Sequence, residues 1–140
     1  MTKYFLLFSL FITITSSLSG KNLKLANTFS DGIVFQRDKP INIWGSATPN
    51  KPINLIFGNE TKTSQSDDAG KWTITIGPLK ASSKPRAMSV RSEGNEIKIE
   101  DILVGEVWVC GGQSNMAWTL RGSTNADIEI PAANYPEIRF

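Results

Sequence analysis

The sequence predicts a mainly β chain, in which a β-sandwich domain at residues 21–103 is followed by the first strand and helix of an incomplete α/β domain at residues 104–140. Two observations lead to this fold class. Up to residue 103, short β-type segments alternate with turn residues, and no apolar run at helical spacing is long enough for a convincing helix. After residue 104 the apolar residues become continuous and glycines follow, which is typical of a buried parallel strand.

The first segment, residues 1–19 (MTKYFLLFSLFITITSSLS), has the layout of a secretory signal peptide. Lys3 provides a basic start, an apolar stretch follows, and small serines precede the expected cleavage point. An uncleaved membrane anchor is the alternative, but the apolar stretch is shorter than the roughly 20 residues that cross a bilayer. We therefore expect export to the periplasm or the cell exterior, without stable membrane insertion after cleavage.

The next segments alternate in the way of strands with one buried and one wet face. Residues 41–45 (INIWG) alternate apolar and polar side chains after Pro40, which suits the entry to a strand. Residues 53–57 (INLIF) lead through Gly58 and Asn59 into ETKTSQS. This pattern predicts a hairpin, because both linking residues tolerate positive φ.

Three further strands complete the predicted sandwich. Residues 71–76 (KWTITI) place Trp72, Ile74 and Ile76 on one face. A polar bridge, KASSKP, leads to two more strands within AMSVRS and NEIKIEDILV, which are joined around residues 93–95. About seven short strands at this spacing fit a β-sandwich of roughly 80 residues.

Two tryptophans of this region permit two interpretations. Trp44 and Trp72 alternate with polar neighbours, which favours the burial of both in the sandwich core. The alternative is that one of them binds sugar, since aromatic faces stack on carbohydrate rings.

Charge and composition exclude several function classes. Removal of the signal segment takes away Lys3 and no acidic residue, so the net charge falls from +2 to about +1 and gives no reason to expect nucleic-acid binding. The chain has no histidine and one cysteine, Cys110, which we expect to pack in the core. A transition-metal site is therefore not expected. The pair Asp67 and Asp68 indicates a turn rather than calcium binding.

The region after residue 104 predicts the start of an α/β unit. The run VGEVWVC is expected to form a strand covered on both faces. Ser123 or Thr124 could cap a short helix that carries Asp127 and Glu129 in its first turns, and Pro131 limits its length. The closing PEIRF is typical of the start of a second strand.

Ser114 follows Gly111 and Gly112 in the block CGGQSNM, directly after that expected strand. Ligands of open α/β sheets bind beyond the carboxyl ends of the strands, and the two glycines permit a tight turn with an accessible backbone. A nucleophilic serine needs a base, usually a histidine, and this chain has none. The spacing alone is equally compatible with a turn in which Ser114 or Asn115 caps a helix.

Three separated segments resemble, in this order, the amino-terminal part of sialate O-acetylesterases, a branch of the SGNH hydrolase superfamily. They are FSDGIVFQRDKPINIWGSA, DDAGKWTITIGPLKA and DILVGEVWVCGGQSNM, and the resemblance covers roughly residues 25–120. It implies that Ser114 is the nucleophile and that its backbone amide contributes to the oxyanion hole, with Gly112, Gln113 and Asn115 as the neighbouring turn residues. The family's partner histidine and aspartate lie in a later block, which nothing in this chain matches.

The resemblance implies an exported carbohydrate esterase that hydrolyses O-acetyl esters on sialic acid or related sugars through an acetyl-serine intermediate. It implies no metal and no organic cofactor. Ala117 stands where many relatives have Glu. Without the partner histidine and aspartate, the chain is expected to be inactive alone. The alternative function is that of a secreted β-sandwich module that binds carbohydrate or serves a structural role without catalysis.

Overall fold

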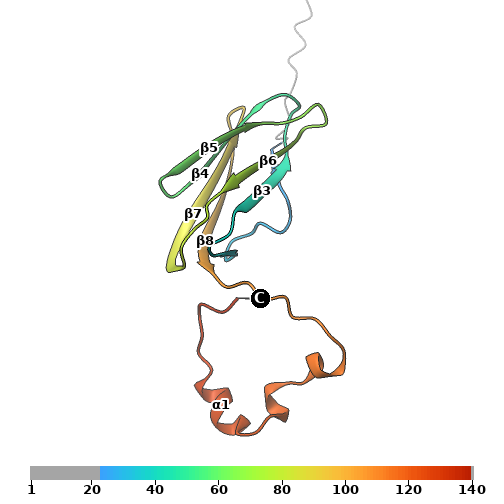
Figure 1. Ribbon diagram of the computed structural model, residues 1–140, viewed down its shortest axis with the longest axis vertical. Helices are drawn as coiled ribbons and strands as arrows, with labels where there is room; N and C mark the ends of the chain where they lie inside the picture. Colours follow the sequence, from blue (N-terminus) through green and yellow to red (C-terminus); the bar gives the residue numbers. More distant parts are fainter. Residues whose placement is uncertain (1–22, 140) are drawn as a thin grey trace, which may run out of the picture.

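The computed structural model describes residues 23–139, in which eight strands are followed by a segment with three short helices (Figure 1). The prediction of a mainly β chain is confirmed. The expected signal peptide lies outside the described residues. Within residues 23–139, no helix combines the length and the apolar character that crossing a bilayer requires.

The strands form two sheets. The smaller sheet is antiparallel and has the order β1-β3-β6, from strands β1 (Lys24–Leu25), β3 (Ile41–Ser46) and β6 (Lys71–Ile76). The larger sheet has the order β2-β8-β7-β4-β5, from strands β2 (Val34–Gln36), β4 (Pro52–Phe57), β5 (Glu60–Gln65), β7 (Ser82–Ser92) and β8 (Asn95–Gly105). Its strands pair antiparallel except β2, which runs parallel to β8. In Figure 1, β3 and β6 lie in front of the long β7–β8 hairpin.

One hydrophobic core joins the two sheets. The predicted face of Trp72, Ile74 and Ile76 is confirmed, because all three side chains are buried. Burying a side chain of this size contributes about 1.5–3 kcal/mol to stability, so the alternation along the strands is the main reason why the sheets associate. The other core side chains from the strands are Phe35, Ile43, Ile53, Leu55, Phe57, Met88, Val90, Ile99, Ile102 and Val104.

The predicted hairpin turns are present. Gly58 and Asn59 connect β4 to β5, and Gly58 has φ +58°. Glu93 and Gly94 connect β7 to β8 with φ values of +48° and +77°. Both central residues of the β7–β8 turn therefore have positive φ, whereas in the β4–β5 turn only Gly58 does. Either arrangement gives a two-residue turn whose twist matches that of the strands.

The acidic pair before β6 serves a turn, as predicted. Asp67 Oδ1 accepts hydrogen bonds from the backbone N–H groups of Ala69 (2.9 Å) and Lys71 (2.7 Å). Asp68 Oδ1 accepts a hydrogen bond from the side-chain amide of Asn50 at 3.0 Å. Among residues 23–139, no group of three or more histidine, cysteine or acidic side chains is placed to hold a metal ion.

Two expectations for the β region are wrong. The bridge KASSKP is not a connection along its whole length, because β7 already begins at Ser82 and runs through an irregular register up to Met88. Trp72 is buried, but Trp44 is 44% exposed. The reason is the strand period of two, which turns Ile43 into the core and therefore Trp44 out of it.

The segment after β8 also differs from expectation. The run VGEVWVC is not one strand, because β8 ends at Gly105 and residues 106–112 have no regular secondary structure. A strand needs a hydrogen-bonded neighbour, and residues 106–112 pair with no strand of the described chain. The expected strand within PEIRF is absent from residues 136–139 for the same reason.

The predicted short helix is present as α1 (Ala126–Ala132), with Asp127 and Glu129 in its first turn and Pro131 near its end. The expected caps are wrong. Asn125, rather than Ser123 or Thr124, occupies the N-cap position, in a left-handed conformation (φ +61°) and without a side-chain capping bond. The helix therefore depends little on capping for its position.

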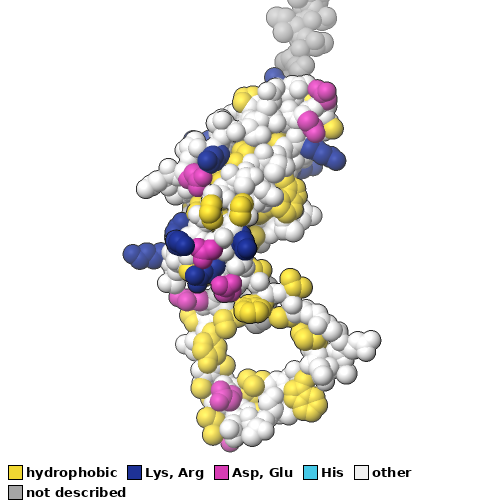
Figure 2. All heavy atoms as spheres, in the orientation of Figure 1, with side chains coloured by type: hydrophobic (Ala, Val, Ile, Leu, Met, Phe, Trp, Pro, Cys, Tyr) yellow, Lys and Arg dark blue, Asp and Glu magenta, His cyan; other side chains and the backbone are white. Residues whose placement is uncertain are grey.

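The side chains of residues 106–139 are largely exposed. Cys110, expected in the core, is exposed, and Trp108, Val109 and Trp118 are 82%, 97% and 69% exposed. Figure 1 shows this segment as an open loop beyond the β strands, and Figure 2 shows hydrophobic side chains around the opening. These residues lie away from the core that joins the two sheets, so that core cannot cover them.

Candidate functional site

The block CGGQSNM forms a tight turn that leads into a 3₁₀ helix, η1 (Ser114–Ala117). The backbone carbonyl of Gln113 accepts a hydrogen bond from the N–H group of Met116 at 2.9 Å, which closes the turn. A Cβ atom on Gly112 would lie only 2.9 Å from Cγ of Met116, and the φ of this residue is +156°. The predicted need for glycine here is therefore a matter of space as well as of backbone freedom.

Ser114 is the first residue of η1 and is exposed. The capping interpretation is wrong, because the N-cap position belongs to Gln113 and no side chain caps the helix. No histidine exists in the chain to take the proton of the Ser114 hydroxyl. The turn thus presents a serine hydroxyl to solvent without a base beside it.

The first N–H groups of η1 belong to Ser114 and Asn115, and the first N–H groups of a helix have no intrahelical acceptor. Such groups can bind a developing oxyanion when they point to one place. That Gly112, Gln113 and Asn115 belong to an oxyanion hole stays a prediction, as does the nucleophilic role of Ser114.

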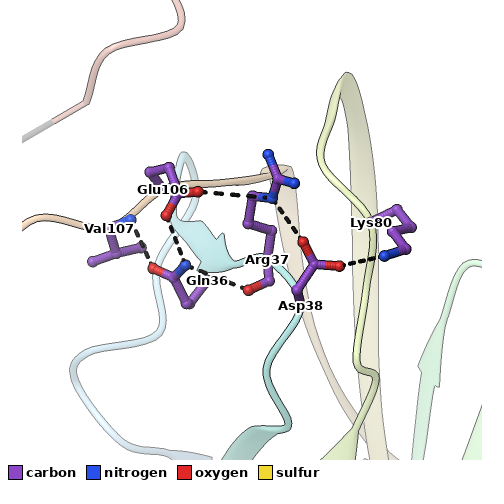
Figure 3. Close-up of polar contacts among 6 residues, drawn as sticks. All are labelled: Gln36, Arg37, Asp38, Lys80, Glu106 and Val107. Carbon is purple, nitrogen blue, oxygen red and sulfur yellow. Dashed lines mark hydrogen bonds and ion pairs between the residues drawn. The ribbon is translucent and has the colours of Figure 1, made fainter.

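A side-chain clamp fixes the chain where it leaves β8 (Figure 3). Gln36, the last residue of β2, accepts a hydrogen bond from the N–H group of Val107 through Oε1 (2.9 Å) and donates one from Nε2 to the Glu106 carboxylate (3.0 Å). The backbone N–H of Arg37 donates to the carbonyl of Gly105 at 2.9 Å. We call Gln36, Glu106 and Val107 the exit clamp. It fixes the direction in which the chain leaves β8 towards Ser114.

Charged side chains extend the exit clamp across the end of the sheets, as Figure 3 shows. Arg37 Nε lies 2.8 Å from Asp38 and 3.7 Å from Glu106, and Lys80 Nζ lies 2.7 Å from the other oxygen of Asp38. The hydrogen bond from Lys80, followed by that from Arg37, lowers the pKa of the Asp38 carboxyl. These groups are exposed, so they orient the exit more than they stabilise the fold.

A contact between Arg139 and Asp101 joins the other end of residues 106–139 to the strands. The guanidinium of Arg139 binds both carboxylate oxygens of Asp101, and it donates a further hydrogen bond to the Asp101 carbonyl at 2.9 Å. Residues 106–139 therefore leave and return to the same end of the β strands (Figure 1).

A cleft of about 1000 Å³ lies between the exit clamp and the Asp101–Arg139 contact. Its lining includes Val34 of β2, Trp108 and Cys110 after β8, and Glu137 and Arg139 at the returning end. Ser114 is not part of this lining. The structure thus brings the two ends of the segment together but leaves Ser114 apart from the cleft.

The sequence predicted neither the exit clamp nor the Asp101–Arg139 contact. For the exit clamp, the sequence shows only that Gln36 and Arg37 come at the end of the apolar run in FSDGIVFQRD; the Asp101–Arg139 contact has no local signal, since its residues lie 38 positions apart. Gln36 and Glu106 lie 70 positions apart, and no local pattern predicts pairings at such separations.

The tether between Asp101 and Arg139 is expected to open in acid. The Arg139 hydrogen bond lowers the pKa of Asp101 from its usual 3.8. A carboxyl with a depressed folded-state pKa contributes its stabilisation above the unfolded-state pKa and loses it as the pH falls through the lower folded-state value. We expect the NMR signals of the Arg139 guanidinium to be constant at neutral pH and to move towards free arginine only below pH 3.8.

The control for this pH dependence is Asp101→Asn, which should give the released Arg139 signals at every pH. A transition of the wild-type signals at a pH above 3.8 would contradict the tether.

Comparison with known proteins gives one consistent group of relatives. The chain is 28% identical to the sialate O-acetylesterase of Mus musculus over 142 residues and 27% identical to that of Homo sapiens over 133 residues. These alignments cover 94% and 87% of the chain, but only 26% and 25% of the relatives. The chain thus spans about a quarter of the length of the curated relatives that it matches. No protein-family model matches the chain.

A solved structure agrees with these relatives. A carbohydrate acetylesterase from Xanthomonas citri superimposes with a TM-score of 0.72 at 35% sequence identity. The match covers 80% of this chain and 26% of that protein. In each of these comparisons, the chain therefore matches about a quarter of a larger protein.

Proposed function

We propose that this chain, which is sialate O-acetylesterase-like, forms part of a serine-dependent carbohydrate esterase. Its relatives are named as sialate O-acetylesterases and a carbohydrate acetylesterase, which supports ester hydrolysis on acetylated carbohydrate. In this proposal the substrate is an O-acetylated sialic acid or a related sugar, and the protein is exported to the periplasm or the cell exterior.

The observation that carries the proposal is the exposed Ser114 on a turn that favours glycine at position 112. A nucleophile needs an accessible hydroxyl, and the turn provides it without burying the side chain. The unpaired N–H groups at the start of η1 are suited to the oxyanion of an acetyl-transfer intermediate.

The two sheets and the segment after them correspond, in this proposal, to a β-sandwich and the beginning of an SGNH-type hydrolase domain. The remainder of that domain supplies the histidine and the aspartate that activate Ser114. It also covers Trp108, Val109 and Trp118, which the described residues leave exposed. The exit clamp holds the sandwich and the hydrolase domain in a fixed relation.

Labelling with a serine-directed organophosphonate tests the proposal. We expect an adduct on Ser114 in a longer polypeptide that contains this chain together with a histidine-bearing hydrolase segment, because the base raises the nucleophilicity of the hydroxyl. The 140-residue chain should remain unlabelled, and so should the Ser114→Ala variant of the longer protein. Mass spectrometry locates the adduct. An adduct on another residue, or no adduct with the histidine present, would remove the assignment of Ser114.

A further inference from the structure

The outer face of the β1-β3-β6 sheet carries an exposed tryptophan on a polar surface. Trp44 lies in the central strand, and the period of two places Asn42 on the same face. Thr73, the register partner of Trp44, and Thr75, the partner of Asn42, continue this face on β6. Figure 2 shows hydrophobic side chains on the side of β3 and β6 within an otherwise polar surface. We call these outward side chains and their neighbours the Trp44 face, which consists of Lys24, Asn42, Trp44, Lys71, Thr73 and Thr75.

The ring of Trp44 is held in place from one side. Phe29 packs against it at a centroid distance of 4.8 Å and an interplanar angle of 78°, an edge-to-face contact. Such a contact restricts the ring and leaves 44% of the residue open to solvent. The Trp44 ring is therefore both fixed and accessible, which is the state that a stacking ligand requires.

Two lysines lie diagonally across from Trp44, one on each neighbouring strand. Lys24 of β1 and Lys71 of β6 are both register partners of Ser46, two residues beyond Trp44. Each is thus a diagonal cross-strand neighbour of Trp44, at a Cα separation of about 7–8 Å that a long side chain spans. Both are exposed.

The strands of the Trp44 face contribute positive charge only, while Asp31, which lines a pocket together with Lys24 and Phe29, accepts a hydrogen bond from the N–H group of Glu100 at 2.7 Å. Neither Lys24 nor Lys71 forms an ion pair within residues 23–139. The strand positions of this face hold no acidic residue. Asp67, the acidic residue bound to the backbone of Lys71, directs its carboxylate to N–H groups of the turn. An anionic ligand would therefore meet two lysines and no opposing carboxylate on the sheet.

The polar side chains of the Trp44 face have hydrogen-bonding capacity to spare. Thr75 donates its hydroxyl hydrogen to Asn42 Oδ1 at 2.7 Å, which orients the amide and leaves its NH₂ group available. Thr73 is the direct cross-strand partner of Trp44, so its hydroxyl belongs to the same face of the sheet. A ring with nearby hydroxyl and amide groups suits a ligand that has an apolar face and polar edges.

We propose that the Trp44 face is a binding site for a carbohydrate that carries a carboxylate. One face of a pyranose ring stacks on Trp44, its hydroxyl groups bond to Asn42 and Thr73, and its carboxylate pairs with Lys24 and Lys71. The choice of a carbohydrate as the ligand class rests on the proposed esterase function, whereas the carboxylate follows from the two unpaired lysines. The site lies on the β strands, separate from the turn of Ser114.

NMR titration of the ¹⁵N-labelled chain with sialyllactose and with lactose tests the proposal. The chain has four tryptophans, and the variant Trp44→Phe assigns the indole signal of Trp44. We expect sialyllactose to shift this signal and lactose to bind at least about tenfold more weakly, a difference of about 1.4 kcal/mol. Lys71→Gln and Lys24→Gln should each weaken sialyllactose binding and leave lactose binding unchanged.

Matched variants distinguish binding at the Trp44 face from attraction by net charge and from stacking on a different exposed tryptophan. Lys84→Gln removes an exposed lysine from the other sheet and Trp118→Ala removes an exposed tryptophan, and both should bind sialyllactose like the wild type. The lysine variants keep the Trp44–Phe29 contact, so they test the site even if Trp44→Phe loses stability.

Three outcomes would overturn the proposal. The first is an unshifted Trp44 indole signal up to about 10 mM sialyllactose, a concentration that detects even weak binding. The second is equal binding of lactose and sialyllactose, which would remove the role of the carboxylate. The third is an equal loss of binding in Lys84→Gln and Lys71→Gln, which would indicate attraction by net charge only. None of them bears on the labelling of Ser114, so this inference and the proposed function fail separately.

Discussion

The 140-residue chain is expected to hydrolyse p-nitrophenyl acetate no faster than its Ser114→Ala variant. The hydroxyl of Ser114 is exposed, but the chain has no histidine that could remove its proton. Loss of a member of a catalytic triad lowers the rate by about 10⁴-fold or more, so the turnover of this chain should lie below a complete serine esterase by at least that factor.

Initial rates of p-nitrophenol release, measured for both proteins at equal concentration, give the comparison. Circular dichroism of the two samples verifies that both are folded, since an exposed turn serine makes little contribution to the core. A rate that depends on Ser114 would refute the prediction, and it would mean that a group other than histidine activates this hydroxyl.

Gly45→Ala is expected to destabilise the β strands strongly. A Cβ atom at this position would lie 1.9 Å from the backbone carbonyl oxygen of Lys24 and 2.8 Å from a ring carbon of Trp72. Neither neighbour can yield easily, because Lys24 pairs with β3 through its backbone and Trp72 is 3% exposed in the core. We expect a loss of about 3 kcal/mol, at the upper end of the effects of overpacking.

Gly105→Ala is the matched control for this substitution. Gly105 also lies in a strand, but its added Cβ would meet only Cγ1 of Val34, at an ordinary contact distance of 3.6 Å. Urea denaturation of both variants should give a clearly lower midpoint for Gly45→Ala, with Gly105→Ala close to the wild type. Similar midpoints would show that β1 can move away from β3 without loss.

The β strands were largely predictable because their signals are local. The alternation at Trp72, Ile74 and Ile76 and the hairpin residues Gly58 and Gly94 each specify a strand or a turn within a few positions. Trp44 shows the limit of this reasoning. Its strand was predicted, but the face on which it lies depends on where the second sheet packs, which a tryptophan's hydrophobicity does not reveal.

The segment after Gly105 could not be predicted in the same way. The apolar run VGEVWVC is typical of a buried strand, but burial and strand pairing both depend on neighbours that the sequence of this run does not contain. The same apolar context predicts a core position for Cys110, which is exposed in the structure. At the candidate site, the glycine turn and the exposure of Ser114 follow from local sequence, whereas the exit clamp connects residues about 70 positions apart.

The parallel pairing of β2 with β8 has a consequence for the order of folding. The hairpins β4–β5 and β7–β8 join neighbours in sequence and can form early, whereas β2 must wait for a partner about 70 residues downstream. During synthesis from the amino terminus, the larger sheet can acquire β2 only after its partners in β8, residues 103–105, have left the ribosome. The turn of Ser114 follows within a few residues. The step that completes the sheet therefore also anchors the chain that leads to Ser114, and a nascent chain that ends before Leu103 lacks the partners of β2.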